Sequence, residues 1–437
     1  MRNKFKYTKI LAFGLLFSMV ALPSFGQANV EVIGENDAKT SMNSTEEPRW
    51  EDVLRDKLKA IADEADRNYY TTGISVYDLT TDSLLFGYNQ HKMMRPASTQ
   101  KLLTAISALD ILGKDHLYQT AVYLDTESVE IVDSLGRGGI NGNIYIIGDF
   151  DPKLQVSDLK TIAKALKERN ICFANGLIAD LSMKDTLILG NGWCWDDEQP
   201  FLTPLSLSGS DYECTNVKIN RYQPARRLLE TAVAAFADDS IYINKGVGFG
   251  QYKPKAGRQP ICVLTHSIEE VLQRMMKNSD NLYAESMFYQ LAADTKKGIG
   301  WKDCAVRVSE VIAKTGAPSQ YAEVADGSGL SLYNYVTPSI EVAMLRYAYK
   351  HEKMFGTLYH SLPIAGVDGT IGNRMLTGKA NRNVHAKTGT VTGVSCLAGY
   401  LTASNGHLVA FSIMNNGLKK VAEGKRFEDR ICEIICE

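Results

Sequence analysis

The sequence lacks the patterns that mark metal-binding and nucleic-acid-binding proteins. Its eight cysteines include no Cys-x-x-Cys pair and its seven histidines are scattered, so no zinc site is indicated. The net charge is −2, with no basic tract and no alternation of basic and aromatic residues, which argues against a nucleic-acid partner. No internal repeat occurs. What remains is a globular composition, 45% hydrophobic and 22% charged, and 437 residues are enough for two or more domains.

Long apolar runs are also absent, with one exception at the N-terminus. Four basic residues among the first nine precede an apolar stretch at residues 10–22, and Pro23 and Gly26 follow it. This arrangement predicts a signal peptide over residues 1–28. The alternative, a membrane anchor, requires about 20 apolar residues, and this stretch has 13. No cysteine lies near the cleavage region, so we expect no lipid anchor and predict an exported, periplasmic and soluble protein.

The pattern of residues after the signal peptide predicts the first elements of a folded domain. Residues 29–48 are polar and lack periodicity, which predicts a flexible lead. From Trp50 onward we expect a helix, a β-hairpin with its turn at residues 80–82, and an apolar helix that ends at Gly113. The apolar face of the first helix comprises Val53, Leu54, Leu58, Ile61 and Ala62.

Between residues 119 and 262 the pattern changes to short strands and glycine-rich turns, with one clear amphipathic helix at 159–169. Long helical patterns return after residue 265, followed by strands and a final helix at 421–436. We therefore expect one domain formed by 49–118 and 263–437, interrupted by an inserted region at 119–262. Export permits disulfides, but the pairing cannot be read from sequence, and buried free thiols are an equal alternative.

Three short patterns, S-x-x-K, S-x-N and K-T-G, occur twice each, and together they form a catalytic signature. Of the S-x-x-K copies, Ser157–Lys160 precedes an amphipathic helix, so a serine cap with Asp158 in the first turn explains it. Ser98 opens an almost wholly apolar helix, and Lys101 lies one turn further, within reach of its hydroxyl. Burial disfavours the charged amine, and a neutral lysine can activate a serine nucleophile.

The two S-x-N copies lie at residues 41–43 and 279–281. The first falls in the flexible lead and is set aside. The second joins two apolar helical segments at a tight junction, which can aim the Ser279 hydroxyl and the Asn281 amide into a cleft. An ordinary polar turn is the alternative.

The two K-T-G copies stand in different contexts. Lys314 lies in the last turn of a predicted helix, with Gly316 at the capping position, so this copy is a helix stop. Lys387 lies among β-branched and small residues, which predicts a strand. On that strand Gly389 would let a substrate backbone approach closely, beside the Thr388 and Thr390 hydroxyls.

With Ser98, Ser279 and Lys387 in the required order, the sequence resembles the class C, low-molecular-mass penicillin-binding proteins, the D-alanyl-D-alanine carboxypeptidases/endopeptidases of the peptidase S13, penicillin-binding protein 4 type. Four longer stretches carry this resemblance: GNIYIIGDFDP at 142–152, GWCWDDEQ at 192–199, DGSGLSLYNYVTP at 326–338 and LPIAGVDGTIGNRM at 362–375. At 149–152 the family often has a more glycine-rich run. The resemblance implies an α/β (α+β) fold: a transpeptidase/β-lactamase-like domain of helices on an antiparallel sheet, interrupted by a mainly β accessory insertion.

The resemblance also implies a mechanism. Ser98 attacks the carbonyl of the penultimate D-Ala in a peptidoglycan stem peptide, and Lys101 takes its proton. Ser279 relays a proton to the departing D-Ala, and Asn281 holds the substrate amide. The terminal carboxylate is expected to bind at Lys387, Thr388, Gly389 and Thr390, with the backbone N–H groups of Ser98 and Thr390 as the oxyanion hole.

By weaker analogy, Asp151 contacts the cationic end of a diamino acid in the stem. No metal or cofactor is expected, and β-lactams are expected as covalent inhibitors. A β-lactamase on the same core is one alternative, but the E-x-x-L-N string of class A enzymes is absent. A catalytically silent cell-wall protein is another, and three intact motifs argue against it.

Overall fold

The computed structural model describes residues 49–66, 70–126, 129–131, 133–194, 197, 200, 202–208, 222–254, 256–294 and 298–437. The predicted signal peptide, the predicted lead and the S-x-N copy at 41–43 lie outside the described residues. Among the helices of the described residues, none is long and apolar enough to cross a membrane.

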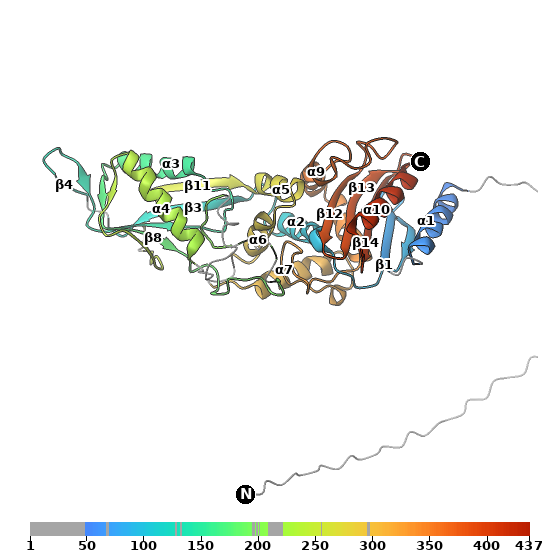
Figure 1. Ribbon diagram of the computed structural model, residues 1–437. Coiled ribbons are helices and arrows are strands. Elements are labelled where there is room, and N and C mark those ends of the chain that lie inside the picture. The colour runs from blue at the N-terminus through green and yellow to red at the C-terminus, as the bar shows by residue number, and fades with distance from the viewer. Residues whose placement is uncertain are drawn as a thin grey trace, which may run out of the picture. The chain divides into compact units, whose positions relative to one another are not determined.

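A five-stranded antiparallel sheet with strand order β12-β13-β14-β1-β2 carries the candidate site (Figure 1). Its strands are β1 (Thr71–Asp78), β2 (Ser83–Tyr88), β12 (His385–Val391), β13 (Val394–Thr402) and β14 (Leu408–Asn416). The predicted hairpin is β1–β2, and its turn is closed because the Asp78 carboxylate accepts hydrogen bonds from the amides of Thr80 and Thr81. At the opposite edge, β12 contacts the turn that precedes the apolar helix.

Helices cover both faces of this sheet (Figure 1). Helices α1 (Trp50–Asp66) and α10 (Val421–Cys436) pack on one face, and α2 (Gln100–Ile111) and α8 (Pro338–Tyr349) pack on the other. The other helices on the α2 side are α5 (Ile268–Lys277), α6 (Asn281–Gln290), α7 (Trp301–Lys314) and α9 (Glu352–Ser361). The short 3-10 turns are η1 (Ala97–Thr99), η2 (Ser319–Tyr321) and η3 (Gly369–Ile371).

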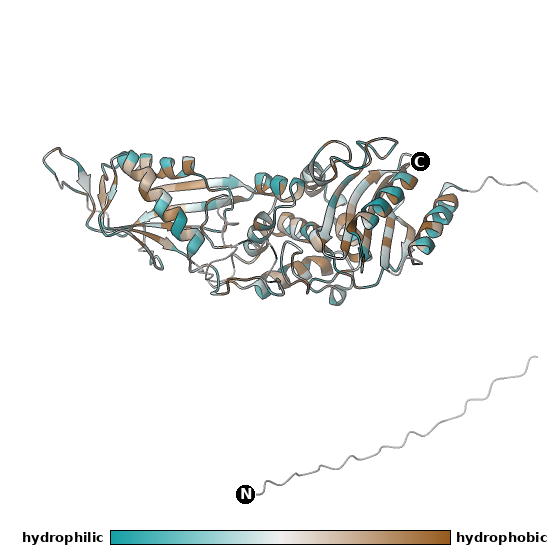
Figure 2. Cartoon of the chain, in the orientation of Figure 1, coloured by the Kyte–Doolittle hydropathy of each residue, from teal (hydrophilic) through white to brown (hydrophobic). Residues whose placement is uncertain are grey.

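The period of two along a strand divides each strand between the two cores. On β13, Ala398 and Tyr400 join the core under α2 and α8, whereas Leu397 and Leu401 join the core under α1 and α10. In Figure 2, α1 and α10 carry hydrophilic and hydrophobic residues side by side, as helices with one solvent face do. Helix α2 differs, because ten of its 12 residues are buried. Truncation of one buried leucine costs about 2–5 kcal/mol. The packing of α2 therefore fixes the position of η1, the turn at its N-terminus.

A second five-stranded sheet has the order β10-β8-β6-β3-β11. Its strands are β3 (Leu117–Leu124), β6 (Asn143–Ile147), β8 (Gly176–Asp180), β10 (Val247–Phe249) and β11 (Cys262–Ser267). Strands β6, β8 and β10 run parallel, and β3 is antiparallel to β6 and β11. Two small pairs are β4 (Glu130–Ile131) with β5 (Gly138–Gly139), and β7 (Phe173–Ala174) with β9 (Tyr242–Ile243).

The region of the second sheet contains more helix than expected. Helix α3 (Val156–Lys167) was predicted, but α4 (Gln223–Asp238), which packs against α3, was not. The two helices have 12 and 16 residues, so this region is mixed α/β and not mainly β. Most buried positions of α4 are alanines and leucines at helical spacing, so α4 is as amphipathic as α3.

Two local predictions were wrong. Val53 is 38% exposed, because it lies outside the face of α1 that packs on the sheet. Ser157 is exposed in the first turn of α3 and does not cap it; the helix begins after Gln155, whose amide donates to Asp158. Six cysteines that the structure describes are free thiols: Cys172, Cys262, Cys304, Cys396, Cys432 and Cys436.

The described residues between Arg49 and Glu437 belong to one compact unit. The second sheet and its core are drawn from residues 117–267, so we propose, as the sequence predicts, that 119–262 is an accessory insertion into a domain made of 49–118 and 263–437.

Candidate functional site

The first part of the site is the tight turn η1, which leads into α2. Ala97 has a φ of +47°, a conformation that non-glycine residues seldom adopt and that is often found at functional sites. The Thr99 hydroxyl donates to Glu341 at 2.5 Å, and Ser412 donates to the other oxygen of the same carboxyl at 2.8 Å. Burial raises the pKa of Glu341 to about 7. These bonds hold the turn against α8 and the sheet and leave Ser98 partly exposed.

Lys101 lies one turn into α2 and is 0% exposed. Its Nζ lies 2.9 Å from Ser98 Oγ, 2.7 Å from Asn281 Oδ1 and 2.7 Å from the Ser328 carbonyl oxygen. Burial lowers the pKa of Lys101 to about 8, although nearby carboxylates oppose this shift. A neutral amine has two N–H donors and one lone pair, so it can donate to Asn281 and Ser328 while it accepts the Ser98 proton.

A second buried amine, Lys387, lies on β12 and is also 0% exposed. Its Nζ donates to Ser279 Oγ and to the Thr388 carbonyl oxygen, both at 2.8 Å. Burial and the charge of Lys101 hold the pKa of Lys387 well below its usual range. Ser279, with a φ of +58°, stands in the short junction between α5 and α6, as predicted. The junction is held because Asp280 pairs with Arg274 at 2.8 Å.

The glycine of the second K-T-G has a structural role that the sequence analysis missed. A Cβ on Gly389 would lie 2.3 Å from the Pro96 carbonyl oxygen and 3.1 Å from the Thr99 amide nitrogen. Only glycine therefore lets β12 pack this closely on η1. Next to it, Thr390 is exposed, and the Thr388 hydroxyl donates to Thr370 Oγ1 at 2.8 Å. The structure thus brings Ser98, Lys101, Ser279, Asn281 and Lys387 together, with Thr388, Gly389 and Thr390 along the edge strand.

Asp151 lies in a different environment. It is 1% exposed, its Oδ2 lies 2.6 Å from His266 Nδ1, and its Oδ1 accepts from the Lys153 amide at 2.9 Å. Burial raises the pKa of this carboxyl. Its contact with a substrate stays a prediction, and in this structure both oxygens have protein partners.

The other copies of S-x-x-K and K-T-G, which lie within the described residues, are surface features. Lys314 ends α7, pairs with Asp110 at 2.6 Å and is 53% exposed, and Gly316 follows with a φ of +81°. That copy is the helix stop that the sequence predicts.

One residue that contacts this cluster and two that support it were not singled out from sequence. Ser328 supplies the carbonyl that accepts from Lys101, and the buried carboxylates of Glu285 and Asp326 hold its loop. Burial and the charge of Asp326 raise the pKa of Glu285 to about 8. The quoted stretch at 326–338 contains two of the three, so the resemblance marked the segment without revealing its contacts.

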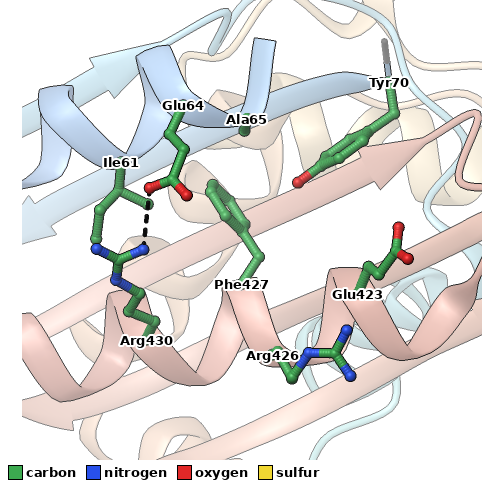
Figure 3. Close-up of a pocket in the computed structure, with 8 residues that line it drawn as sticks. All are labelled: Ile61, Glu64, Ala65, Tyr70, Glu423, Arg426, Phe427 and Arg430. Carbon is green, nitrogen blue, oxygen red and sulfur yellow. Dashed lines mark hydrogen bonds and ion pairs between the residues drawn. The ribbon is translucent and has the colours of Figure 1, made fainter. Parts of the chain in front are cut away.

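A separate pocket of about 410 Å³ lies between α1 and α10 (Figure 3). Its lining contains Glu64 and Arg430, which form an ion pair at 3.1 Å, and the rings of Tyr70 and Phe427. None of the site residues lines it, and α2 packs on the opposite face of the sheet. Among the described residues, no group of three or more His, Cys, Asp or Glu side chains is placed to hold a metal ion.

The chain is similar to known proteins in sequence and in fold. A family model described as the D-Ala-D-Ala carboxypeptidase 3 (S13) family matches residues 54–224 and 203–435. The chain is 26% identical over 415 residues to the D-alanyl-D-alanine carboxypeptidase DacB of Haemophilus influenzae, covering 79% of this chain and 85% of that protein. It is 27% identical over 445 residues to a D-alanyl-D-alanine carboxypeptidase of an Actinomadura species, covering 83% and 81%.

Solved structures show the same fold. The crystal structure of penicillin binding protein 4 (dacB) from Haemophilus influenzae superposes with a TM-score of 0.73 at 23% identity, over 89% of this chain and 100% of that one. A structure of the same protein in complex with a β-lactam superposes with a TM-score of 0.67 at 24% identity, over 86% and 98%.

Proposed function

We propose that this chain cleaves D-Ala-D-Ala bonds of peptidoglycan stem peptides through an acyl-enzyme on Ser98. The chain belongs to the D-Ala-D-Ala carboxypeptidase 3 (S13) family and is a serine-type D-Ala-D-Ala peptidase. The observation that carries this proposal is the buried Lys101 amine, which lies 2.9 Å from Ser98 Oγ. The same chemistry would act on a D-Ala cross-link. We also propose that the protein is exported to the periplasm, on the basis of the N-terminal sequence.

In the first step, neutral Lys101 accepts the Ser98 proton while Ser98 Oγ attacks the carbonyl of the penultimate D-Ala. Asn281 and the Ser328 carbonyl hold the amine, since they accept its two N–H groups at 2.7 Å. The negative charge that develops on the substrate oxygen would be met by the backbone N–H groups of Ser98 and Thr390. One such donor contributes about 3 kcal/mol in comparable sites.

Lys387 is proposed to bind the terminal carboxylate of the substrate. In the free site, burial and the charge of Lys101 oppose protonation of Lys387. A carboxylate at this position would favour the ammonium form and form charge-assisted hydrogen bonds with it. Ser279, which accepts from Lys387 at 2.8 Å, would then relay the proton that Lys101 took from Ser98 to the D-Ala nitrogen as the C–N bond breaks. Water attacks the acyl-enzyme and releases the shortened stem.

The test is the variant Ser98→Ala, assayed for D-Ala release from a pentapeptide and for covalent labelling by a fluorescent penicillin. Both signals should disappear, because the attacking oxygen is removed. Ser157→Ala is the matched control and should behave as the unmodified chain. Retained labelling of Ser98→Ala would exclude Ser98 as the nucleophile. The β-lactam complex of the Haemophilus influenzae protein supports penicillin as the probe.

A further inference from the structure

The loop at residues 190–193, which precedes α4 in the chain, bonds to the 326–334 loop, whose Ser328 carbonyl accepts from Lys101. The Trp193 indole N–H donates to Asp326 Oδ2 at 2.8 Å, across 133 positions of sequence. Beside it, the Asn191 carbonyl accepts from Ser331 Oγ at 2.6 Å, and the Gly192 carbonyl accepts from the Leu332 amide at 3.3 Å. Three successive residues of one loop therefore bond to the 326–334 loop.

This close approach depends on two glycines. Gly192 has a φ of +77°, and a Cβ there would lie 2.6 Å from Ser331 Oγ and from the Tyr333 ring. A Cβ on Gly190 would lie 2.1 Å from the Trp193 ring. Side chains at these positions would displace the indole, so the local sequence is built to place Trp193 against Asp326.

Asp326 is 1% exposed and organises its own loop. Its Oδ1 accepts from the Gly329 amide and from Asn334 Nδ2, both at 2.7 Å. Its Oδ2 accepts from the Ser331 amide at 2.7 Å and from Trp193. Burial of a carboxylate is costly unless its oxygens accept hydrogen bonds, and the indole is the donor that comes from outside the loop.

The 326–334 loop contacts Lys101 directly and also contacts η1, the turn that carries Ser98. Glu285 accepts from the Gly327 and Ser328 amides at 3.1 and 2.8 Å, and the Ser328 carbonyl accepts from Lys101. A Cβ on Gly329 would lie 1.8 Å from the Ala97 carbonyl oxygen, so the loop also touches η1. A shift of this loop would move the acceptor of Lys101 and the support of the turn that carries Ser98.

We propose that Trp193 is a positioning residue, which acts through Asp326 to hold the Ser328 carbonyl against Lys101. The inference rests on the proposed role of Lys101 as base. It makes part of the predicted insertion a component of the catalytic apparatus, although Trp193 touches neither Ser98 nor Lys101 in the described contacts.

The experiment is a double-mutant cycle on acylation and turnover. Trp193→Phe removes the N–H and keeps an aromatic ring; its expected effect is a roughly 10-fold lower kcat with an unchanged KM, because the base is displaced and substrate contacts stay. Asp326→Asn should lower kcat further. In the Asp326→Asn background, Trp193→Phe should add less than about 2-fold, because coupled positions do not add. Trp301→Phe, on α7 and outside this network, is the matched control and should leave kcat unchanged.

Three outcomes would overturn the proposal: an unchanged kcat in Trp193→Phe, a raised KM at constant kcat, or losses that multiply in the double variant. If Trp193→Phe does not reach full penicillin labelling, site-specific replacement of Trp193 by its benzothienyl analogue keeps the ring shape without the N–H, and the same outcomes apply. Failure of the proposed function is separate, because it shows as persistent labelling of Ser98→Ala.

Discussion

The two S-x-x-K segments have the same letters and opposite surroundings. Ser98 lies in η1, directly before α2, and Lys101 lies among the first ten residues of α2, all of which are buried. Ser157 and Lys160, in contrast, are both exposed on α3. The two K-T-G segments differ in the same way, since Lys387 is 0% exposed and Lys314 is 53% exposed. The comparison shows that burial and a hydroxyl partner, and not the letters, distinguish Lys101 and Lys387 from the two exposed lysines, and these are the grounds on which we propose a base and an anion site.

The largest expected effect is at Lys101. Lys101→Arg should lower kcat/KM about 10³-fold, because general bases contribute about 10²–10⁴-fold and a guanidinium stays protonated. Lys160→Arg should be indistinguishable from the unmodified chain. Both are measured as D-Ala release and as the penicillin acylation rate. Equal activity of the two variants would remove the distinction between the segments.

The second effect concerns the two K-T-G lysines. Lys387→Met should lower kcat/KM by roughly 10- to 100-fold, because a charge-assisted hydrogen bond is worth about 1.5–3 kcal/mol. Substrates that end in an amide in place of the carboxylate should lose less. Lys314→Met removes an exposed ion pair with Asp110, worth about 0–1 kcal/mol, and should leave activity intact. If the Lys387→Met loss is the same for amide and acid substrates, carboxylate binding is not its role.

The third effect is a shift in pH dependence. Lys101 must be neutral to accept a proton, so kcat/KM should rise with pH through the pKa of about 8. The Asp326 charge raises the pKa of Lys101 against the larger effect of burial. Asp326→Asn removes that charge, so the pKa of Lys101 falls and the acid limb should move to lower pH. A limb that moves to higher pH, or stays in place, would contradict the electrostatic assignment.

The smallest effect compares two glycines. Gly389→Ala places a Cβ 2.3 Å from the Pro96 carbonyl oxygen and should lower the free energy of unfolding by about 1–3 kcal/mol, as overpacking does. Gly356 lies inside α9, with nothing within 4 Å of an added Cβ. Gly356→Ala should stabilise by about 0.5–1 kcal/mol. Denaturant unfolding checks both, and a stabilised Gly389→Ala would mean that β12 does not pack on η1 as described.

Local periodicity predicted much of the fold. The final helix at 421–436, the hairpin of β1 and β2, and the junction that carries Ser279 agree with the structure, because each depends on neighbours within a few positions. Helix α4 was not predicted, although its buried alanines and leucines recur at helical spacing as clearly as the buried residues of α3 do. The order of three motifs, read with their contexts, was enough to assemble the candidate site.

Contacts between distant segments could not be predicted from one sequence. Trp193 and Asp326 are 133 positions apart, and no periodicity connects them. The reason for Gly389 was also hidden, because the Pro96 carbonyl that excludes a side chain belongs to a turn far away in sequence. Such contacts arise only when the sheet edge and the turn meet in the folded chain.

The most direct test of the central claim is to locate the acyl group. The chain is incubated with penicillin and digested, and mass spectrometry identifies the modified peptide. The account predicts one adduct per chain, on the peptide that contains Ser98, and no adduct on the peptide that contains Ser157. An adduct on any other residue, or none under conditions in which the folded chain releases D-Ala, would contradict it.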